Sequence, residues 1–224
     1  MLTCGSFIDQ YWAHYISMEK EFFNTIKYAS LNIENYNTFS EAYSKLMLEI
    51  GSEVDVILKV FCKLLQPAFS GNSIKDYMAL INIKVPDFST QEVKIESFEI
   101  KVQPWINWNN SVGSISPYWW TAYNKIKHDR TGTGTIDGIT KEYFKFGNQK
   151  NTLLALAGLY QILIFTYYIL ATAENKKVLV PLPGSRIFEL TGGIWDSIIF
   201  FKDFALYLDS DTGEMHMEIS TVFY

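Results

Sequence analysis

Cysteine and arginine are scarce in this sequence, and each scarcity limits what the protein can be. Only Cys4 and Cys62 occur, far apart and without a CxxC pair. A disulfide framework and a zinc knuckle both need more cysteines at closer spacing, so neither is expected. Two free thiols suit a reducing setting. Arg130 and Arg186 stand against 17 lysines, and we expect them where a planar guanidinium is needed rather than a simple charge.

The motifs of common enzyme classes are missing as well. No GxSxG, HExxH or EF-hand pattern occurs, and the spacing of Gly132, Gly134 and Gly138 gives neither GxGxxG nor a Walker loop. The first basic residue is Lys20, and no charged segment followed by an apolar run opens the chain, so no secretory signal is expected. We therefore predict a cytoplasmic protein without a metal ion or cofactor.

What the chain does have is enough apolar sequence to fold. Its 224 residues are 48% hydrophobic and 19% charged, which excludes a disordered chain and suggests a single domain over residues 1–224. Helical spacing of apolar side chains predicts helices near residues 6–30, 38–65, 72–83 and 118–130. Three residue pairs mark helix starts: Ser6 with Asp9, Thr38 with Glu41, and Ser116 with Pro117.

The longest uncharged stretch is residues 153–173, in which 17 of 21 residues are apolar. That length is enough to cross a membrane. Gln161 and three tyrosines lie within the stretch, however, and lysines flank it on both sides. A helix that is apolar all round also suits the centre of a bundle, where the stripes of the other helices can cover it. We favour a core helix and no membrane contact.

Two regions have the alternation of strands. Residues 92–103 alternate apolar residues with Lys and Glu and predict one strand with a kink, and residues 205–208 and 215–219 predict a terminal hairpin. The glycine- and threonine-rich residues 131–138 are interpreted as a flexible loop. The fold class is therefore mainly α, a bundle of about four to five helices. Its core spans residues 6–66 and 116–174, with β and loop decorations at residues 84–115 and 178–224.

Glu53 lies on the apolar stripe of the second helix, between Ile50 and Ile57. A carboxylate is costly to bury without a partner. We therefore expect Glu53 to be buried against a polar or basic group of the helix that starts at Pro117. Such a contact fixes helix packing or belongs to an active site.

The second polar constellation is the sequence NKIKHDR, residues 124–130. On a helix Asn124 and His128 share a face, which makes a polar seam beside an aromatic one. Residues 124–150 carry a net charge of +3, against −8 for the remainder. Cations near a helix C-terminus also complement the helix dipole, so the charge has a structural explanation as well as a functional one.

The order of these elements resembles the HEPN superfamily (higher eukaryote and prokaryote nucleotide-binding). The residues that carry the resemblance are Glu53 and Lys59 in the second helix, the Asn124-x-x-x-His128 step and the long apolar helix. The superfamily's nuclease motif is an Arg, then a polar residue, then His. Here His128 and Asn124 match, and Tyr123 fills the Arg position.

The resemblance implies a small helical bundle, often a homodimer, and in many members a metal-independent ribonuclease of a toxin or phage-defence system with a cognate antitoxin. In that case His128 would be the general acid or base, Asn124 would orient it, and Arg130 or Lys125 would contact phosphate, with Glu53, Tyr123 and Lys127 in support. The alternative is an inactive HEPN-like module that binds a nucleotide, RNA or a protein. In that class four tryptophans would offer contact area, although packing in the core is the interpretation we favour for them: Trp105, Trp108, Trp119 and Trp120.

Overall fold

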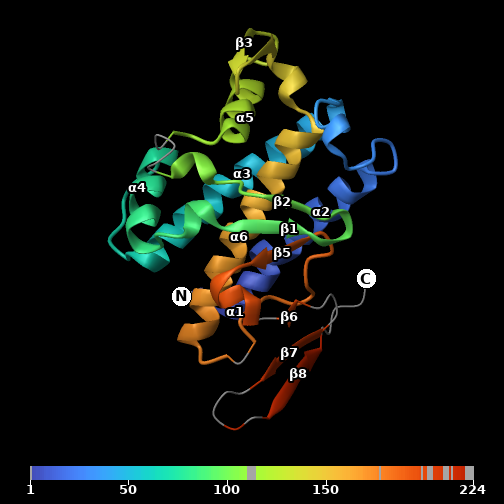
Figure 1. The fold of residues 1–224 in the computed structure, drawn as a ribbon. Coiled ribbons are helices and arrows are strands. Elements are labelled where there is room, and N and C mark those ends of the chain that lie inside the picture. Colours follow the sequence, from blue (N-terminus) through green and yellow to red (C-terminus); the bar gives the residue numbers. More distant parts are fainter. Residues whose placement is uncertain are drawn as a thin grey trace.

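The computed structural model describes residues 2–109, 115–176, 178–197, 199–200, 204–208, 212 and 214–219. The fold is mainly α with small antiparallel sheets, as the sequence predicts. Figure 1 shows α6 running through the middle of the molecule, with α5 and β3 at one end and β7 and β8 at the other.

The first helical region is interrupted rather than uniform. Helix α1 (Cys4–Phe7) continues into a π-helical turn (Ile8–Trp12) and then into α2 (Ala13–Thr25). The predicted cap, Ser6 with Asp9, is wrong by three residues. The Thr3 hydroxyl accepts a hydrogen bond from the Ser6 amide at 3.2 Å and so forms the capping box earlier in the chain.

The next helices begin at serine caps. In α3 (Glu41–Leu65) the Ser40 hydroxyl accepts a hydrogen bond from the Tyr43 amide at 3.1 Å, so the N-cap is Ser40 and not Thr38. Helix α4 (Ile74–Lys84) is capped by Ser73. Helix α5 (Tyr118–His128) has Pro117 itself at the N-cap, so the predicted cap by Ser116 is also wrong.

Helix α6 (Gln149–Ala173) is the centre of the core, packed by α2, α3 and α5. It is long and apolar enough to cross a membrane, but 78% of its most apolar window is buried inside the protein. Two of its buried polar side chains donate to backbone carbonyls: Gln161 Nε2 to Phe88 at 2.6 Å and Thr166 Oγ1 to Ile162 at 2.7 Å. This placement agrees with the prediction of a core helix.

Residues 92–103 form a hairpin rather than one kinked strand. β1 (Glu92–Ile95) pairs antiparallel with β2 (Ile100–Val102), and Glu99 takes a left-handed φ of 51° in the turn between them. A third strand, β5 (Phe188–Thr191), covers the other side of β1 and gives the order β2–β1–β5. The predicted kink is therefore the turn that reverses the chain.

The segment interpreted as a flexible loop is a second hairpin. β3 (Thr133–Ile136) pairs with β4 (Ile139–Glu142), and the turn residues Asp137 and Gly138 have φ of 52° and 73°. An Asp-Gly pair in this conformation is a preferred two-residue turn. The predicted C-terminal hairpin is confirmed as β7 (Phe204–Leu208) and β8 (Met215–Ile219), with β6 (Ile199–Phe200) beside β7.

The four tryptophans are core residues. Trp105, Trp108 and Trp119 are at most 1% exposed, and Trp120 is 8% exposed. The Trp105 indole donates to the Gly158 carbonyl at 3.2 Å, while Trp119 packs edge-on against Trp105 with ring centres 5.0 Å apart. They supply packing between α5 and α6, so the idea that they form an exposed contact surface is wrong.

Candidate functional site

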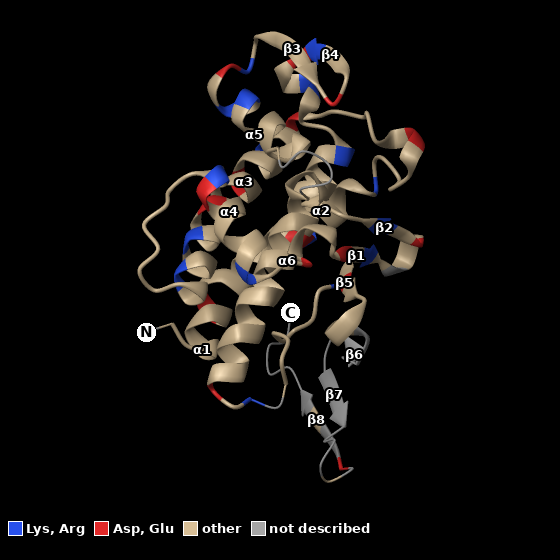
Figure 2. Cartoon of the chain, turned by 60° about the vertical axis from the view of Figure 1, so that its left-hand side comes forward, with Lys and Arg blue, Asp and Glu red and all other residues tan. Residues whose placement is uncertain are grey.

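The end of α5 carries most of the predicted site residues. The buried face of this helix packs onto the core, while Lys127 and His128 are exposed at its last turn. The chain then returns through the β3–β4 hairpin, and the amide of Phe144 donates to the Arg130 carbonyl at 3.1 Å. We call residues 118–146 the basic cap. Figure 2 marks the positions of its Lys and Arg residues along the ribbon, at the α5 and β3–β4 end of the molecule.

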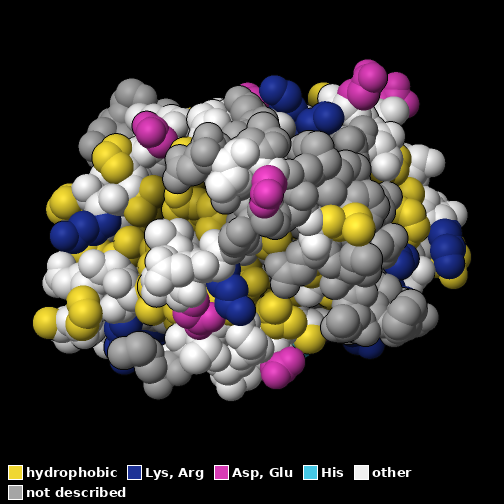
Figure 3. All heavy atoms as spheres, turned by 90° about the horizontal axis from the view of Figure 1, so that it is seen from below, with side chains coloured by type: hydrophobic (Ala, Val, Ile, Leu, Met, Phe, Trp, Pro, Cys, Tyr) yellow, Lys and Arg dark blue, Asp and Glu magenta, His cyan; other side chains and the backbone are white. Residues whose placement is uncertain are grey.

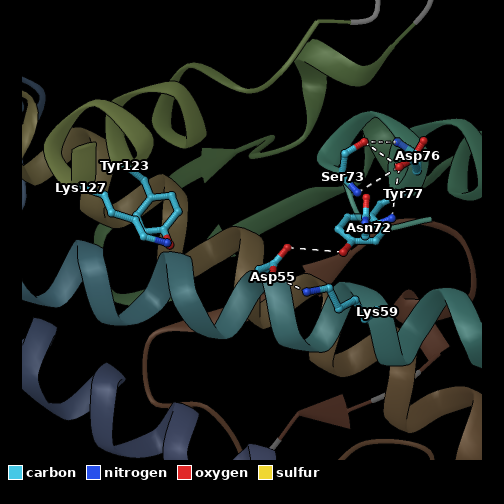
Figure 4. A network of polar contacts seen from close by, with 8 residues as sticks. All are labelled: Asp55, Lys59, Asn72, Ser73, Asp76, Tyr77, Tyr123 and Lys127. Atoms are coloured by element: carbon cyan, nitrogen blue, oxygen red, sulfur yellow. Dashed lines mark hydrogen bonds and ion pairs between the residues drawn. The ribbon is translucent and has the colours of Figure 1, made fainter. Parts of the chain in front are cut away.

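Tyr123, at the motif's Arg position, is a packing residue. It is 4% exposed and its ring lies flat on Gly51 of α3, where an added Cβ would come within 2.5 Å of Cε2. Lys127, one turn later, donates to the Tyr123 hydroxyl at 3.3 Å. Figure 4 shows both side chains projecting from α5 toward α3. The position that would hold the Arg therefore faces the core rather than a groove.

The same view contains a separate polar network between α3 and α4. Asp55 pairs with Lys59 at 2.7 Å and accepts a hydrogen bond from the Tyr77 hydroxyl at 3.4 Å, while Ser73 and Asp76 cap α4 (Figure 4). Burial raises the pKa of Tyr77, and Asp55 adds to that rise. The network joins the two helices, and none of its members lies in the basic cap.

Asn124 and His128 share a face of α5, as predicted, but no hydrogen bond joins them. The Asn124 amide donates back to the Trp120 carbonyl at 3.0 Å. The His128 side chain is exposed and makes no hydrogen bond within the described part of the chain. Asn124 therefore does not orient the imidazole in this structure.

Three cations of the region are neutralised by carboxylates. Both oxygens of Glu41 accept from Arg130 Nη2, at 2.5 and 2.7 Å. The other two pairs are Lys145 with Glu142 at 2.7 Å and Lys150 with Asp137 at 3.0 Å. Arg130 is thus held toward the start of α3 and not toward His128.

Three further lysines lie over aromatic rings and have no carboxylate partner among the described residues. The Lys125 ammonium is 4.9 Å from the centre of the Tyr143 ring, Lys141 is 4.6 Å from Phe146, and Lys127 is 5.5 Å from Tyr123. Burial, and then the charge of Lys145, lower the pKa of Lys141. Cations are therefore crowded here. At the opposite end of the molecule, the charged side chains that are drawn are scattered with both signs interspersed (Figure 3).

An aromatic pair that the sequence analysis missed adjoins these lysines. Phe39, just before α3, is 45% exposed and packs edge-on against Phe144, with ring centres 5.8 Å apart. The Lys145 ammonium lies 5.7 Å from the Phe144 ring centre. The alternation of Lys and aromatic residues in KEYFKF, residues 141–146, could have indicated this arrangement.

Glu53 differs from its prediction. It is half-buried rather than fully buried, and burial raises the pKa of its carboxyl. The charged group that lowers this pKa is His14 of α2, not a residue of α5. The buried stripe of α3 runs through Ile50, Val54 and Ile57, which leaves Glu53 at its border. The predicted partner on α5 is therefore wrong.

The fully buried carboxylate is Glu19, which the sequence analysis also missed. It is 2% exposed on α2 and binds the segment before β5. Tyr15 Oη and the Arg186 amide donate to it at 2.8 and 2.9 Å, and the Ser185 hydroxyl donates to it as well. Burial raises the pKa of Glu19, while these hydrogen bonds act in the opposite direction.

A small pocket of about 20 Å³ is lined by Lys141 and Phe146 of the cap together with Lys150, and neither His128 nor Asn124 lines it. Larger hollows lie elsewhere. A groove of about 510 Å³ borders β2 and a hollow of about 680 Å³ borders β5, and neither is lined by His128 or Asn124. Among the described residues, no three His, Cys, Asp or Glu side chains form a group that could hold a metal ion. Comparisons of the chain with family models, curated proteins and solved structures find no match.

Proposed function

We propose that the basic cap binds a single-stranded nucleic acid without cleaving it, and that the protein is a HEPN-like binding module. The observation that supports this most is the set of three lysines, Lys125, Lys127 and Lys141, that lie on one cap without carboxylate partners. Their charge can meet a ligand without breaking an ion pair, whereas Arg130, Lys145 and Lys150 would each first have to leave a carboxylate, Glu41, Glu142 or Asp137.

Phosphate is the ligand chemistry that fits these cations. A strand that places phosphates against the cap releases counterions, and this release favours binding whatever the base sequence. The low pKa of Lys141 reflects partly buried positive charge, which a bound phosphate would relieve. The whole chain has a formal net charge of −5, so an extended nucleic-acid strand is attracted to this end and repelled elsewhere.

Base stacking is the second expected contribution. Phe39, which is 45% exposed, and the half-buried Phe144 form an edge-on pair next to Lys145. An aromatic face beside a cation is what single-strand binding proteins offer to a base. Such stacking is tolerant of sequence because every base has a π-face. A flexible single strand can reach both the aromatic pair and the lysines, whereas a rigid duplex keeps its bases stacked on one another.

Three contacts disfavour cleavage. Tyr123 is packed on Gly51, Asn124 is turned back to Trp120, and Arg130 is paired with Glu41. Internal attack by a ribose 2′-hydroxyl needs a base and a cation that meet at one phosphate. His128 has neither an orienting partner nor an adjacent free guanidinium among the described residues.

The test is a fluorescence anisotropy titration with labelled RNA and DNA strands of about ten nucleotides. Wild-type protein should bind with a dissociation constant on the order of 10 to 100 µM near physiological salt. The variant Lys125→Ala/Lys127→Ala/Lys141→Ala should bind roughly tenfold or more weakly. Tighter binding of RNA than of DNA with the same base order would identify RNA as the ligand.

A matched control uses exposed lysines of α4. Lys75→Ala/Lys84→Ala removes two positive charges outside the cap and should leave binding nearly unchanged. The same RNA incubated in EDTA should remain intact. Loss of RNA into 2′,3′-cyclic phosphate ends, abolished by His128→Ala, would instead establish the ribonuclease.

A further inference from the structure

A groove of about 510 Å³ runs beside β2, and neither Phe39 nor Phe144 lines it. Its walls are the loop at residues 31–36, the β1–β2 hairpin at residues 98–102, and Leu153 and Leu154 in the first turns of α6. Most of the lining is apolar. Ile33 at the rim is 76% exposed, so this apolar surface is open to solvent.

The hairpin wall of this groove is an open sheet edge. The sheet order β2–β1–β5 leaves β2 at one edge, and no described strand pairs with its outer side. A strand at an edge presents unpaired backbone N–H and C=O groups, which can pair with an added extended chain. Apolar side chains of such a chain can enter the adjacent groove, which is the usual way in which strand addition gains specificity.

Apolar and charged side chains alternate along β2, and this alternation determines which residues an added strand needs on each face. Ile100 and Val102 are half-buried and lie across from Ile95 and Val93, which are fully buried. Lys101 between them is exposed on the other face. A paired strand would therefore place apolar residues on the side of Ile100 and Val102, and alternate residues beside Lys101.

The charged residues that line the groove indicate the charge of the partner. Its charged lining residues are both lysines, Lys101 and Lys150. Each is held by a surface carboxylate, Glu92 at 2.8 Å and Asp137 at 3.0 Å, and such exposed pairs are weak enough to exchange. A second copy of this chain paired antiparallel through β2 about Lys101 would bring the two Lys101 side chains together, which is unfavourable. An acidic strand would bring opposite charges together.

We propose that the open edge of β2 and the groove beside it bind an extended, acidic segment of a partner protein, in which apolar and acidic residues alternate. The segment adds as a fourth strand to the β2–β1–β5 sheet. No residue of the cap lines this groove, although its Lys150 is paired with Asp137 of the cap.

The probe is a labelled synthetic peptide of roughly eight residues that alternates valine and glutamate. Wild-type protein should bind it at least about tenfold more tightly than a peptide that alternates valine and lysine. N-methylation of every second amide of the valine–glutamate peptide should abolish binding, because it removes the donors that pair with β2. Equal binding of the two charge forms, or of the methylated form, would overturn the proposal.

Two variants keep the test independent of folding. Lys101→Glu should reverse the preference, so that the lysine peptide binds and the glutamate peptide does not, and binding of the lysine peptide itself shows that the variant is folded. Ile33→Asp alters an exposed rim residue and should weaken glutamate-peptide binding roughly tenfold. Lys75→Glu on α4 is the control and should bind like wild type. Glutamate-peptide binding that survives both groove variants would place its site elsewhere and contradict the proposal.

Discussion

Tyr123 and Gly51 depend on each other at the contact between α5 and α3. The ring of Tyr123 occupies the space where a side chain of residue 51 would lie. Gly51→Ala should therefore lower the free energy of unfolding by about 1–3 kcal/mol, because overpacking a filled core forces side chains or backbone to shift. Urea denaturation measures this loss.

Gly5 provides the matched control for that substitution. Gly5 is exposed in α1, and nothing lies within 4 Å of a Cβ added there. Gly5→Ala should therefore raise the free energy of unfolding by about 0.4–1 kcal/mol. Combining Gly51→Ala with Tyr123→Ala should remove most of the clash. An undiminished cost of Gly51→Ala in the Tyr123→Ala background would show that the ring is not its cause.

Glu19 should make stability depend on pH in an unusual direction for a carboxylate. Because burial raises its pKa above the ordinary value of 4.5, the folded state holds the proton more tightly than the unfolded state. Its contribution is complete below the unfolded pKa and is lost as pH rises through the folded pKa. The unfolding free energy of wild type minus that of Glu19→Gln should therefore fall as pH rises above the ordinary carboxyl pKa of 4.5. A difference that rises with pH would mean that the hydrogen bonds outweigh burial.

At the scale of the elements, helix caps decide where α3 begins. Ser40→Ala removes the hydroxyl that accepts from the Tyr43 amide and should cost about 1 kcal/mol. Thr38→Ala, at the cap favoured by the sequence pattern, should change the unfolding free energy by less than half as much. Thermal melts of the two variants compare them directly, and a larger effect at Thr38 would refute the assignment.

Long amphipathic elements could be predicted from the sequence, whereas short pairings could not. The stripe of α3 and the end of that helix before Pro67 follow from apolar spacing and a proline. The apolar alternation shifts by one residue between Ile95 and Phe98 and then resumes, and such a shift alone does not distinguish a kink from the turn at Glu99. The pairing with β5 could not be seen, because β1 and β5 lie far apart in the sequence. The Asp137-Gly138 turn could have been predicted from its Asp-Gly pair, but the neighbouring glycines and threonines favoured the interpretation as a flexible loop.

At the scale of the whole molecule, one apolar helix organises the rest. Helix α6 is buried nearly all round, and its contacts with α2, α3 and α5 fix where α5 projects its last turn. The basic window at residues 124–150 was visible in the sequence, and the structure turns it into a cap at one end. The pairing of Arg130 was not visible, because its partner Glu41 lies 89 residues away along the chain.

The measurement that tests the central claim most directly is the salt dependence of oligonucleotide binding. If Lys125, Lys127 and Lys141 each neutralise one phosphate of a single strand, a plot of the logarithm of the binding constant against the logarithm of salt concentration should have a slope of about −2. Lys127→Ala should reduce that slope in magnitude by about 0.7, and Lys75→Ala should not change it. A slope that is the same in wild type and Lys127→Ala, or no binding at low salt, would contradict the account.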